Sequence, residues 1–178
     1  MAGRGHRLRT TMLGAVATVA LAVAVTASAD DGGGKGKKHD EGHANAAKLL
    51  SARLAPSLPT DPVVHGVPAG AAPWVIKRGH VSLGADGRLE VELQGLVIPV
   101  AHGGLPAGTA RPVTTVSASL YCAPDAAGAA ATTGSVAISE AGNARIEDRI
   151  DLPATCLVPT ILVHPNGLNA YIALPGRR

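Results

Sequence analysis

The stretch from Val113 to Cys122 constrains the fold most, because its side chains alternate in polarity and its last residue is one of two cysteines in the chain. Two sets of side chains would lie on opposite faces of a strand: the apolar set Val116, Ala118, Leu120 and Cys122, and the more polar set Thr115, Ser117, Ser119 and Tyr121. This period of two predicts a half-buried β-strand. The cysteine at its end indicates a covalent link to a distant part of the chain.

The first 29 residues have the pattern of an export signal. Arg4, Arg7 and Arg9 precede an apolar run over residues 12–25, and the small-residue site Ala27-Ser28-Ala29 follows. A basic start, a short apolar run and an A-x-A site predict a secretory signal peptide that is cleaved after Ala29. The run is shorter than the ~20 apolar residues of a membrane-spanning helix. We therefore expect a secreted protein, extracellular or associated with the cell surface, with no transmembrane segment after cleavage.

Removal of this signal changes the charge balance. The whole chain has 16 Lys and Arg against 13 Asp and Glu, a formal charge of +3, and three of the arginines lie within residues 1–29. The mature chain is therefore about neutral. Lys35, Lys37 and Lys38 form a basic cluster among glycines, which is typical of a solvated tail. This balance argues against nucleic acid as a partner.

Cys122 and Cys156 are expected to form a disulfide, because the chain carries an export signal and no other cysteine. The loop that they close holds about 35 residues, for which chain entropy predicts a stabilisation of about 4 kcal/mol. The bridge matters because the chain has no Phe, and Trp74, Tyr121 and Tyr171 are its only large aromatic residues. The core must therefore consist mainly of aliphatic side chains.

Composition divides the mature chain into an N-terminal extension and one folded domain. Residues 30–73 are expected to form a disordered tail, a short helix over 45–55 with Ala47, Leu50 and Leu54 on one stripe, and a Pro/Gly-rich linker. Residues 74–175 have the length of a single β domain, and residues 176–178 form a C-terminal tail.

Turn residues predict three hairpins in this domain. They are centred on Asp86-Gly87, Ala141-Gly142 and Asn166-Gly167. The run Ile161-Leu162-Val163 is apolar on both faces and is expected in a sheet interior. Together these segments predict an all-β fold, an antiparallel sandwich of about seven strands that is immunoglobulin-like in strand count.

The sequence contains few candidates for a functional site. The Gly- and Pro-rich loop over residues 100–112 is the segment most able to host a site, and His102 lies in it. Asp148 falls on the apolar face of its predicted strand, and Trp74 stands at the entrance to the domain. These three residues are weak binding candidates.

Motifs for catalysis and for metal binding are missing from the sequence. His39 and His43 are four residues apart, but Asp40 stands where the zinc-helix motif requires Glu, and Gly42 weakens a helix. Neither a G-x-S-x-G motif nor a phosphate-binding loop occurs. We therefore expect no catalytic residues, no metal and no cofactor.

The abundant Ala, Gly and Val, the signal peptide and the single cysteine pair resemble the small secreted proteins of high-GC actinobacteria that have no assigned activity. This resemblance rests on no diagnostic motif and implies no functional residue. The expected function is that of a secreted non-catalytic β domain that acts by binding or by contributing to the cell surface, and the partners considered are a cell-envelope component and an extracellular protein. The alternatives are a small hydrolase or metal-dependent enzyme with its site at the 100–112 loop, and a protease-inhibitor-like domain.

Overall fold

The computed structural model describes residues 47–123, 128–167 and 169–176. The chain divides into two units, residues 1–41 and 42–178, and all described residues belong to the second. The predicted signal peptide and the tail up to residue 46 lie outside the described residues. Within the described ranges every regular element is a β-strand, and none is a helix that could cross a membrane.

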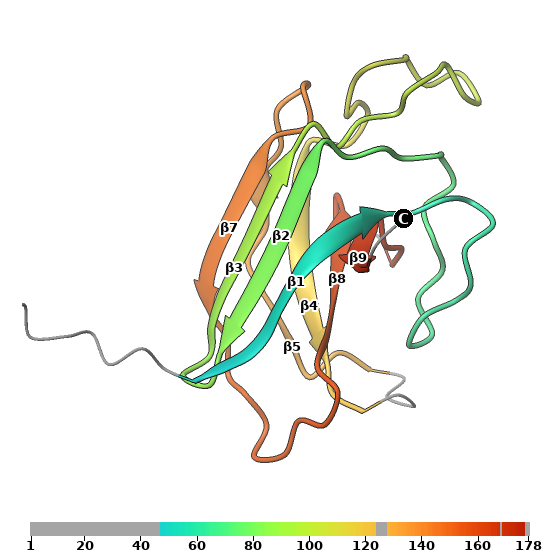
Figure 1. Cartoon of the computed structure of the whole chain (residues 1–178). Coiled ribbons are helices and arrows are strands. Elements are labelled where there is room, and N and C mark those ends of the chain that lie inside the picture. Colours follow the sequence, from blue (N-terminus) through green and yellow to red (C-terminus); the bar gives the residue numbers. More distant parts are fainter. Residues whose placement is uncertain (1–46, 124–127, 168, 177–178) are drawn as a thin grey trace, which may run out of the picture. The chain divides into compact units, whose positions relative to one another are not determined.

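The nine strands belong to one antiparallel sheet. They are β1 (Lys48–Pro56), β2 (Arg78–Gly84), β3 (Arg88–Gln94), β4 (Thr115–Tyr121), β5 (Ala131–Thr132), β6 (Val136–Ala137), β7 (Ala144–Arg149), β8 (Thr160–Pro165) and β9 (Ala173–Pro175). Their order is β5-β4-β8-β9-β1-β2-β3-β7, and β6 also pairs with β4. The sheet curls into a half-barrel (Figure 1). Strands β2, β3 and β7 lie on one side of β1, and strands β9, β8 and β4 lie on the other side. The all-β prediction is confirmed, with more strands than the seven expected.

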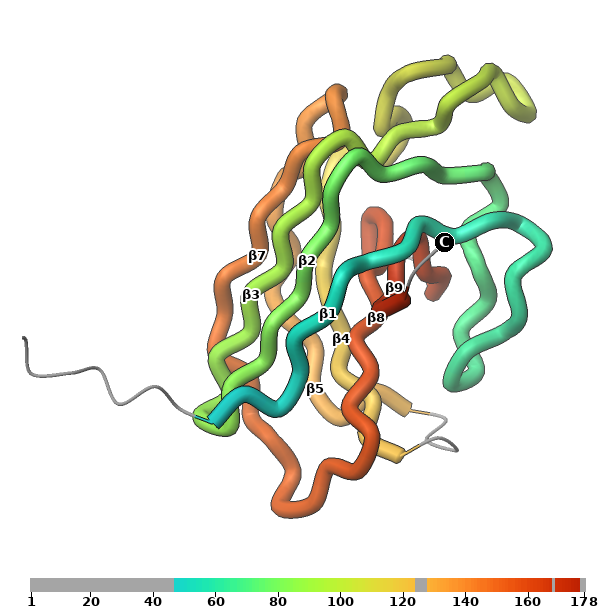
Figure 2. Tube along the Cα trace, in the orientation of Figure 1, coloured from blue at the N-terminus to red at the C-terminus, as the bar shows by residue number. Residues whose placement is uncertain are grey.

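Strand β1 joins the two halves of the sheet. Its first part pairs with β2, up to the register pair Arg53↔His80, and its last three residues pair with β9, from Leu54↔Pro175 to Pro56↔Ala173. The tube in Figure 2 follows β1 as it leaves β2 and crosses to β9. Both halves contribute to a single aliphatic core. Its fully buried members include Val81, Leu89, Val91, Ile146, Val116, Leu120, Ile161 and Val163.

The helix expected over residues 45–55 is wrong, because residues 48–55 belong to β1. Leu50, Ala52 and Leu54 pack against the core, whereas Ser51 and Arg53 are exposed, which is the period of a strand. Leu50 and Leu54 satisfy both periods, so the sequence pattern was ambiguous. The edges of β2 and β9 select the strand, because they offer hydrogen-bond partners to the backbone of this segment, whereas a three-turn helix is only marginally stable on its own.

The Pro/Gly-rich segment after β1 packs on the domain, where a free linker was expected. Val67 is 3% exposed and forms a second cluster with Tyr121, Leu162 and Tyr171. The Tyr171 hydroxyl donates a hydrogen bond to the Pro62 carbonyl oxygen at 2.8 Å. This segment covers Tyr121 of β4 and Leu162 of β8, and Ser117 and Ser119 on the same face of β4 are buried as well. Strand β4 is therefore buried on both faces, where a half-buried strand was expected.

Two of the three predicted hairpins form. Strands β2 and β3 pair around Asp86-Gly87, and β8 meets β9 after Asn166-Gly167, whose two φ angles are 47° and 66°. The hairpin around Ala141-Gly142 is wrong, because β6 pairs with β4 and β7 pairs with β3. The turn residues predicted a reversal of the chain there. They carried no information on which strand each arm would pair with.

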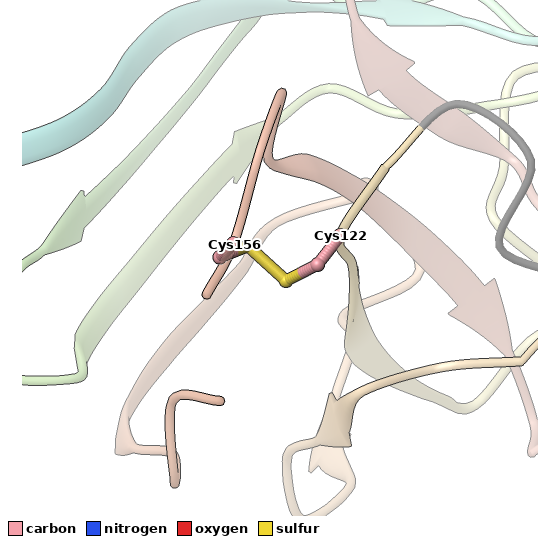
Figure 3. The surroundings of a disulfide bond; sticks show 2 residues. All are labelled: Cys122 and Cys156. Atoms are coloured by element: carbon pink, nitrogen blue, oxygen red, sulfur yellow. A yellow bond between two sulfur atoms is a disulfide. The ribbon is translucent and has the colours of Figure 1, made fainter. Parts of the chain in front are cut away.

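The predicted disulfide forms between Cys122, just after β4, and Cys156, in the segment before β8 (Figure 3). The two Cα atoms are 4.7 Å apart, and both half-buried cysteines pack against the core. The bridge links the end of β4 to the segment that leads into its neighbour β8. The run Ile161-Leu162-Val163 is fully buried in β8, as predicted.

Candidate functional site

A cleft opens where β1 leaves β2. It has a volume of about 880 Å³, and its lining comes mainly from β1, from β2 and from the segment that precedes β2, with Glu92 of β3 and Gly176 at its border. One wall is apolar, formed by Pro56, Val75 and Ile76, and the Val75 side chain is 42% exposed. This volume lies within the usual range of small-molecule sites, about 300 to 1,000 Å³.

The sequence builds the floor of this cleft at Gly79. A Cβ atom there would lie 2.6 Å from Ile76 Cδ1 and 2.8 Å from Leu54 Cβ, closer than real Cβ atoms approach. Glycine therefore allows β1 and the residues before β2 to come together while the two strands diverge. Val75 is held in place by backbone hydrogen bonds with Val97 in both directions, at 2.9 and 3.0 Å.

The polar part of the cleft is mainly cationic. Arg53, Lys77 and Arg78 line it together with His80, and Glu92 is its one acidic residue within the described chain. Arg53 lies directly across from His80, and His80 lies directly across from Glu92, so these residues form a row over β1, β2 and β3. With His80 neutral, the cleft carries a net charge of +2.

The arginines that the structure describes outside this cleft have carboxylate partners. Arg149 bonds the Asp86 carboxylate at 2.9 Å, Arg111 bonds Glu140 at 2.6 Å, and Arg145 pairs with Glu147. A fourth pair, Arg88 with Glu90, is longer at 3.9 Å. The Arg88 amide and then the nearby Arg149 guanidinium lower the pKa of the exposed Asp86 carboxyl. Over the described residues, Arg53, Lys77 and Arg78 have no such carboxylate partner.

The structure separates His102 from Asp148. His102 is exposed in the loop after residue 98, where its backbone bonds that of Leu105. This loop contacts the turn before β7, through the hydrogen bond from Ala110 N to Glu140 O. Asp148 lies near the other end of β7, four residues after its first residue and thus about 13 Å away along the strand.

Asp148 is exposed to solvent, as expected for an acid in a strand, although it shares the parity of the inward-facing Ile146 and Ile150. Its carboxylate accepts hydrogen bonds from the Gly134 and Arg149 amides at 3.2 and 2.8 Å. These two amides hydrogen-bond the Asp148 carboxylate while the side chain stays exposed. Trp74, in contrast, is 4% exposed and belongs to the core cluster, so its ring offers no surface for a ligand.

Several buried polar side chains, among them Ser117, Ser119 and His164, lie on the outer face of β4 and β8. The His65 ring stacks on Tyr121 at 4.8 Å between centroids, and burial raises the pKa of the Tyr121 hydroxyl. His164 is 6% exposed, and its Nδ1 bonds the Ala170 carbonyl oxygen at 2.7 Å. Its buried Nε2 has no hydrogen-bond partner within the described part of the chain, and burial lowers the pKa of this ring. His164 is therefore a structural histidine held neutral.

No cluster of three or more His, Cys, Asp or Glu side chains suited to a metal ion occurs within the described ranges. Comparison of the chain with protein-family models, with curated proteins and with solved structures gives no match. The class is therefore defined by the structure alone: an all-β domain with one disulfide and a cationic cleft in its sheet.

Sequence reasoning missed this cleft for a specific reason. Arg53 belonged to the predicted helix, while Lys77 and Arg78 belonged to the segment before the predicted Asp86-Gly87 hairpin turn, so nothing connected them. A signal was present in the sequence, because Lys77-Arg78 is the one pair of adjacent basic residues within residues 47–176. The missing fact was the register Arg53↔His80, which places β1 beside that pair.

Proposed function

We propose that this protein is a secreted, non-catalytic binding domain, and that the cleft between β1 and β2 is its binding site. The observation that carries the proposal is a cleft of about 880 Å³ that combines an apolar wall with three cations that have no carboxylate partner among the described residues. Charged side chains left without partners at a concave surface are suited to a ligand that supplies the opposite charge.

Secretion is supported by two independent features. Residues 1–29 have the pattern of a signal peptide, and Cys122 and Cys156 form a disulfide, which persists in oxidising compartments. Expression of the whole chain in a secreting host, followed by N-terminal sequencing of the medium fraction, tests this part. The expected new N-terminus is Asp30, and retention of the full-length chain inside the cell would contradict it.

We also propose that the two halves of the curled sheet pack face to face as the two layers of a sandwich, and that β1 connects these layers. The support is the shared core, in which Val91 of β3 and Leu120 of β4 belong to one cluster. Such packing keeps the two halves of the sheet rigid relative to each other, so the cleft between β1 and β2 has a fixed width. A cell-envelope component or an extracellular protein is the proposed source of the ligand.

Affinity capture tests the binding function. The oxidised protein is immobilised and exposed to cell-envelope extract and culture medium, in parallel with V75W and V100W variants. Val75 is 42% exposed in the cleft and Val100 is 61% exposed in the loop after residue 98, so each variant adds one surface indole. We expect V75W to lose the captured component, since the ring fills the cleft, and V100W to retain it.

The two variants also test the earlier alternative site at residues 100–112. Loss of capture with V100W and its retention with V75W would refute the cleft and favour that loop. Circular dichroism and the urea midpoint of both variants show whether each remains folded.

A further inference from the structure

We infer that the cleft binds an organic anion, in which a carboxylate or phosphate group is joined to an apolar chain; this inference rests on the proposed binding function. The anionic group would lie between Arg53 and Arg78. The apolar chain would lie against Pro56, Val75 and Ile76.

The arrangement of the cations supports a single anionic group. Arg78 and His80 are two residues apart on β2 and lie on the same side of the sheet, while Arg53 lies opposite His80. Arg53 and Arg78 thus lie on neighbouring strands, two residues out of register, where β1 leaves β2, and their long side chains can reach toward one group between them. Guanidinium groups match the planar or forked oxygens of carboxylates and phosphates.

Because Arg53, Lys77 and Arg78 form no ion pair within the described chain, the cleft favours a negatively charged ligand. Like charges on neighbouring strands destabilise a sheet, and the other arginines of the described chain offset their charge with Asp or Glu. Glu92 is the one carboxylate in the described cleft, and it accepts a hydrogen bond from Gln94 Nε2 at 2.6 Å without an ion pair. An incoming anion therefore meets two arginines and a lysine with unpaired charge.

The apolar wall favours a ligand with a hydrocarbon part over a bare inorganic ion. Val75 is exposed although it lies beside the buried Trp74, and Ile76 and Pro56 are half-buried residues of the cleft lining. Covering this wall with a short alkyl chain removes apolar surface from water, at about 25 cal/mol per Å². The head group and the chain then contribute independently to affinity.

Isothermal titration calorimetry of the oxidised protein tests these two contributions. The probes are octyl phosphate, octanoate, neutral octyl glucoside and inorganic phosphate. We expect at least one anionic octyl probe to bind, and to bind more tightly than octyl glucoside and inorganic phosphate. The stronger of the two anionic probes identifies a phosphate or a carboxylate as the natural head group. Equal binding of octyl glucoside, or no binding of either anionic probe, overturns the inference.

Matched charge variants test the site. Arg53→Gln and Arg78→Gln should each weaken binding of the anionic probe about tenfold. This factor corresponds to the lower end of the range of contributions that a hydrogen bond to a charged group makes. Arg111→Gln removes the same charge outside the cleft, beside Glu140, and should leave the dissociation constant unchanged. Glu92→Gln removes the negative charge of the cleft and should strengthen binding. Equal weakening by Arg53→Gln and Arg111→Gln would show a general charge effect and overturn the site.

These results separate the ligand class from the function on which it rests. If V75W abolishes capture of a component from the envelope extract while no anionic probe binds, the binding function stands and the anion assignment fails. If V75W captures the same components as the unmodified protein, the cleft fails as a binding site.

Discussion

The turn at residues 138–143 leads the chain from one half of the sheet to the other. Adding a methyl group at Gly142 tests whether this turn packs closely on the backbone of Leu96. Gly142 has φ of 75°, and its carbonyl oxygen accepts a hydrogen bond from Leu96 N at 3.0 Å. A Cβ atom at this position would overlap the backbone nitrogen, carbonyl carbon and carbonyl oxygen of Leu96, well inside the 3.0 Å limit of real Cβ contacts. Backbone atoms cannot move aside as a flexible side chain can.

Gly108 provides the matched control. Its φ of 72° is nearly the same, and a Cβ atom there meets nothing within 4 Å. Gly108→Ala should therefore cost only the left-handed strain of about 1–2 kcal/mol. Gly142→Ala carries the same strain and must also displace the Leu96 backbone, which adds about 1–3 kcal/mol, as for other overpacked sites. The effect of alanine on the unfolded chain is shared by both variants and cancels.

Urea unfolding monitored by Trp74 fluorescence measures the difference. We expect the free energy of unfolding of Gly142→Ala to lie below that of Gly108→Ala by at least about 1 kcal/mol, with equal m-values. Equal losses in the two variants would refute the close packing of this turn on Leu96.

Two further predictions concern the disulfide and the buried histidine. Replacing both Cys122 and Cys156 by Ser should lower the free energy of unfolding by about 4 kcal/mol, because the bridge closes a loop of sequence separation 34; an unchanged urea midpoint would contradict this. Burial lowers the pKa of His164 below the ~6.5 of an unfolded chain, so the unfolded state binds more protons and stability should fall as the pH drops below about 6.5. His164→Leu should reduce this fall between pH 6.5 and 5 in urea titrations, and a slope equal to that of the unmodified protein would refute the assignment.

Local features were readable from the sequence where one short segment contained all the information. The pair Asp86-Gly87 specifies a reversal between two alternating runs, and its hairpin forms. Cys122 had one possible partner, and the disulfide with Cys156 forms. The run Ile161-Leu162-Val163 is apolar on both parities, which requires burial on both faces, and the structure buries it. In each case the physical constraint acts within the segment or allows a single solution.

The tertiary structure decided everything that depended on a choice between distant partners. Leu50 and Leu54 suit a helix or a strand equally, and the edges of β2 and β9 selected the strand. The sequence predicted a reversal of the chain at Gly142, but β6 before it pairs with β4 and β7 after it pairs with β3. The cationic cleft has the same origin, because Arg53 and Arg78 are 25 positions apart and become neighbours only through the register of β1 on β2. Alternation determines which face a side chain occupies, whereas hydrogen bonding between strands far apart in sequence determines which side chains meet.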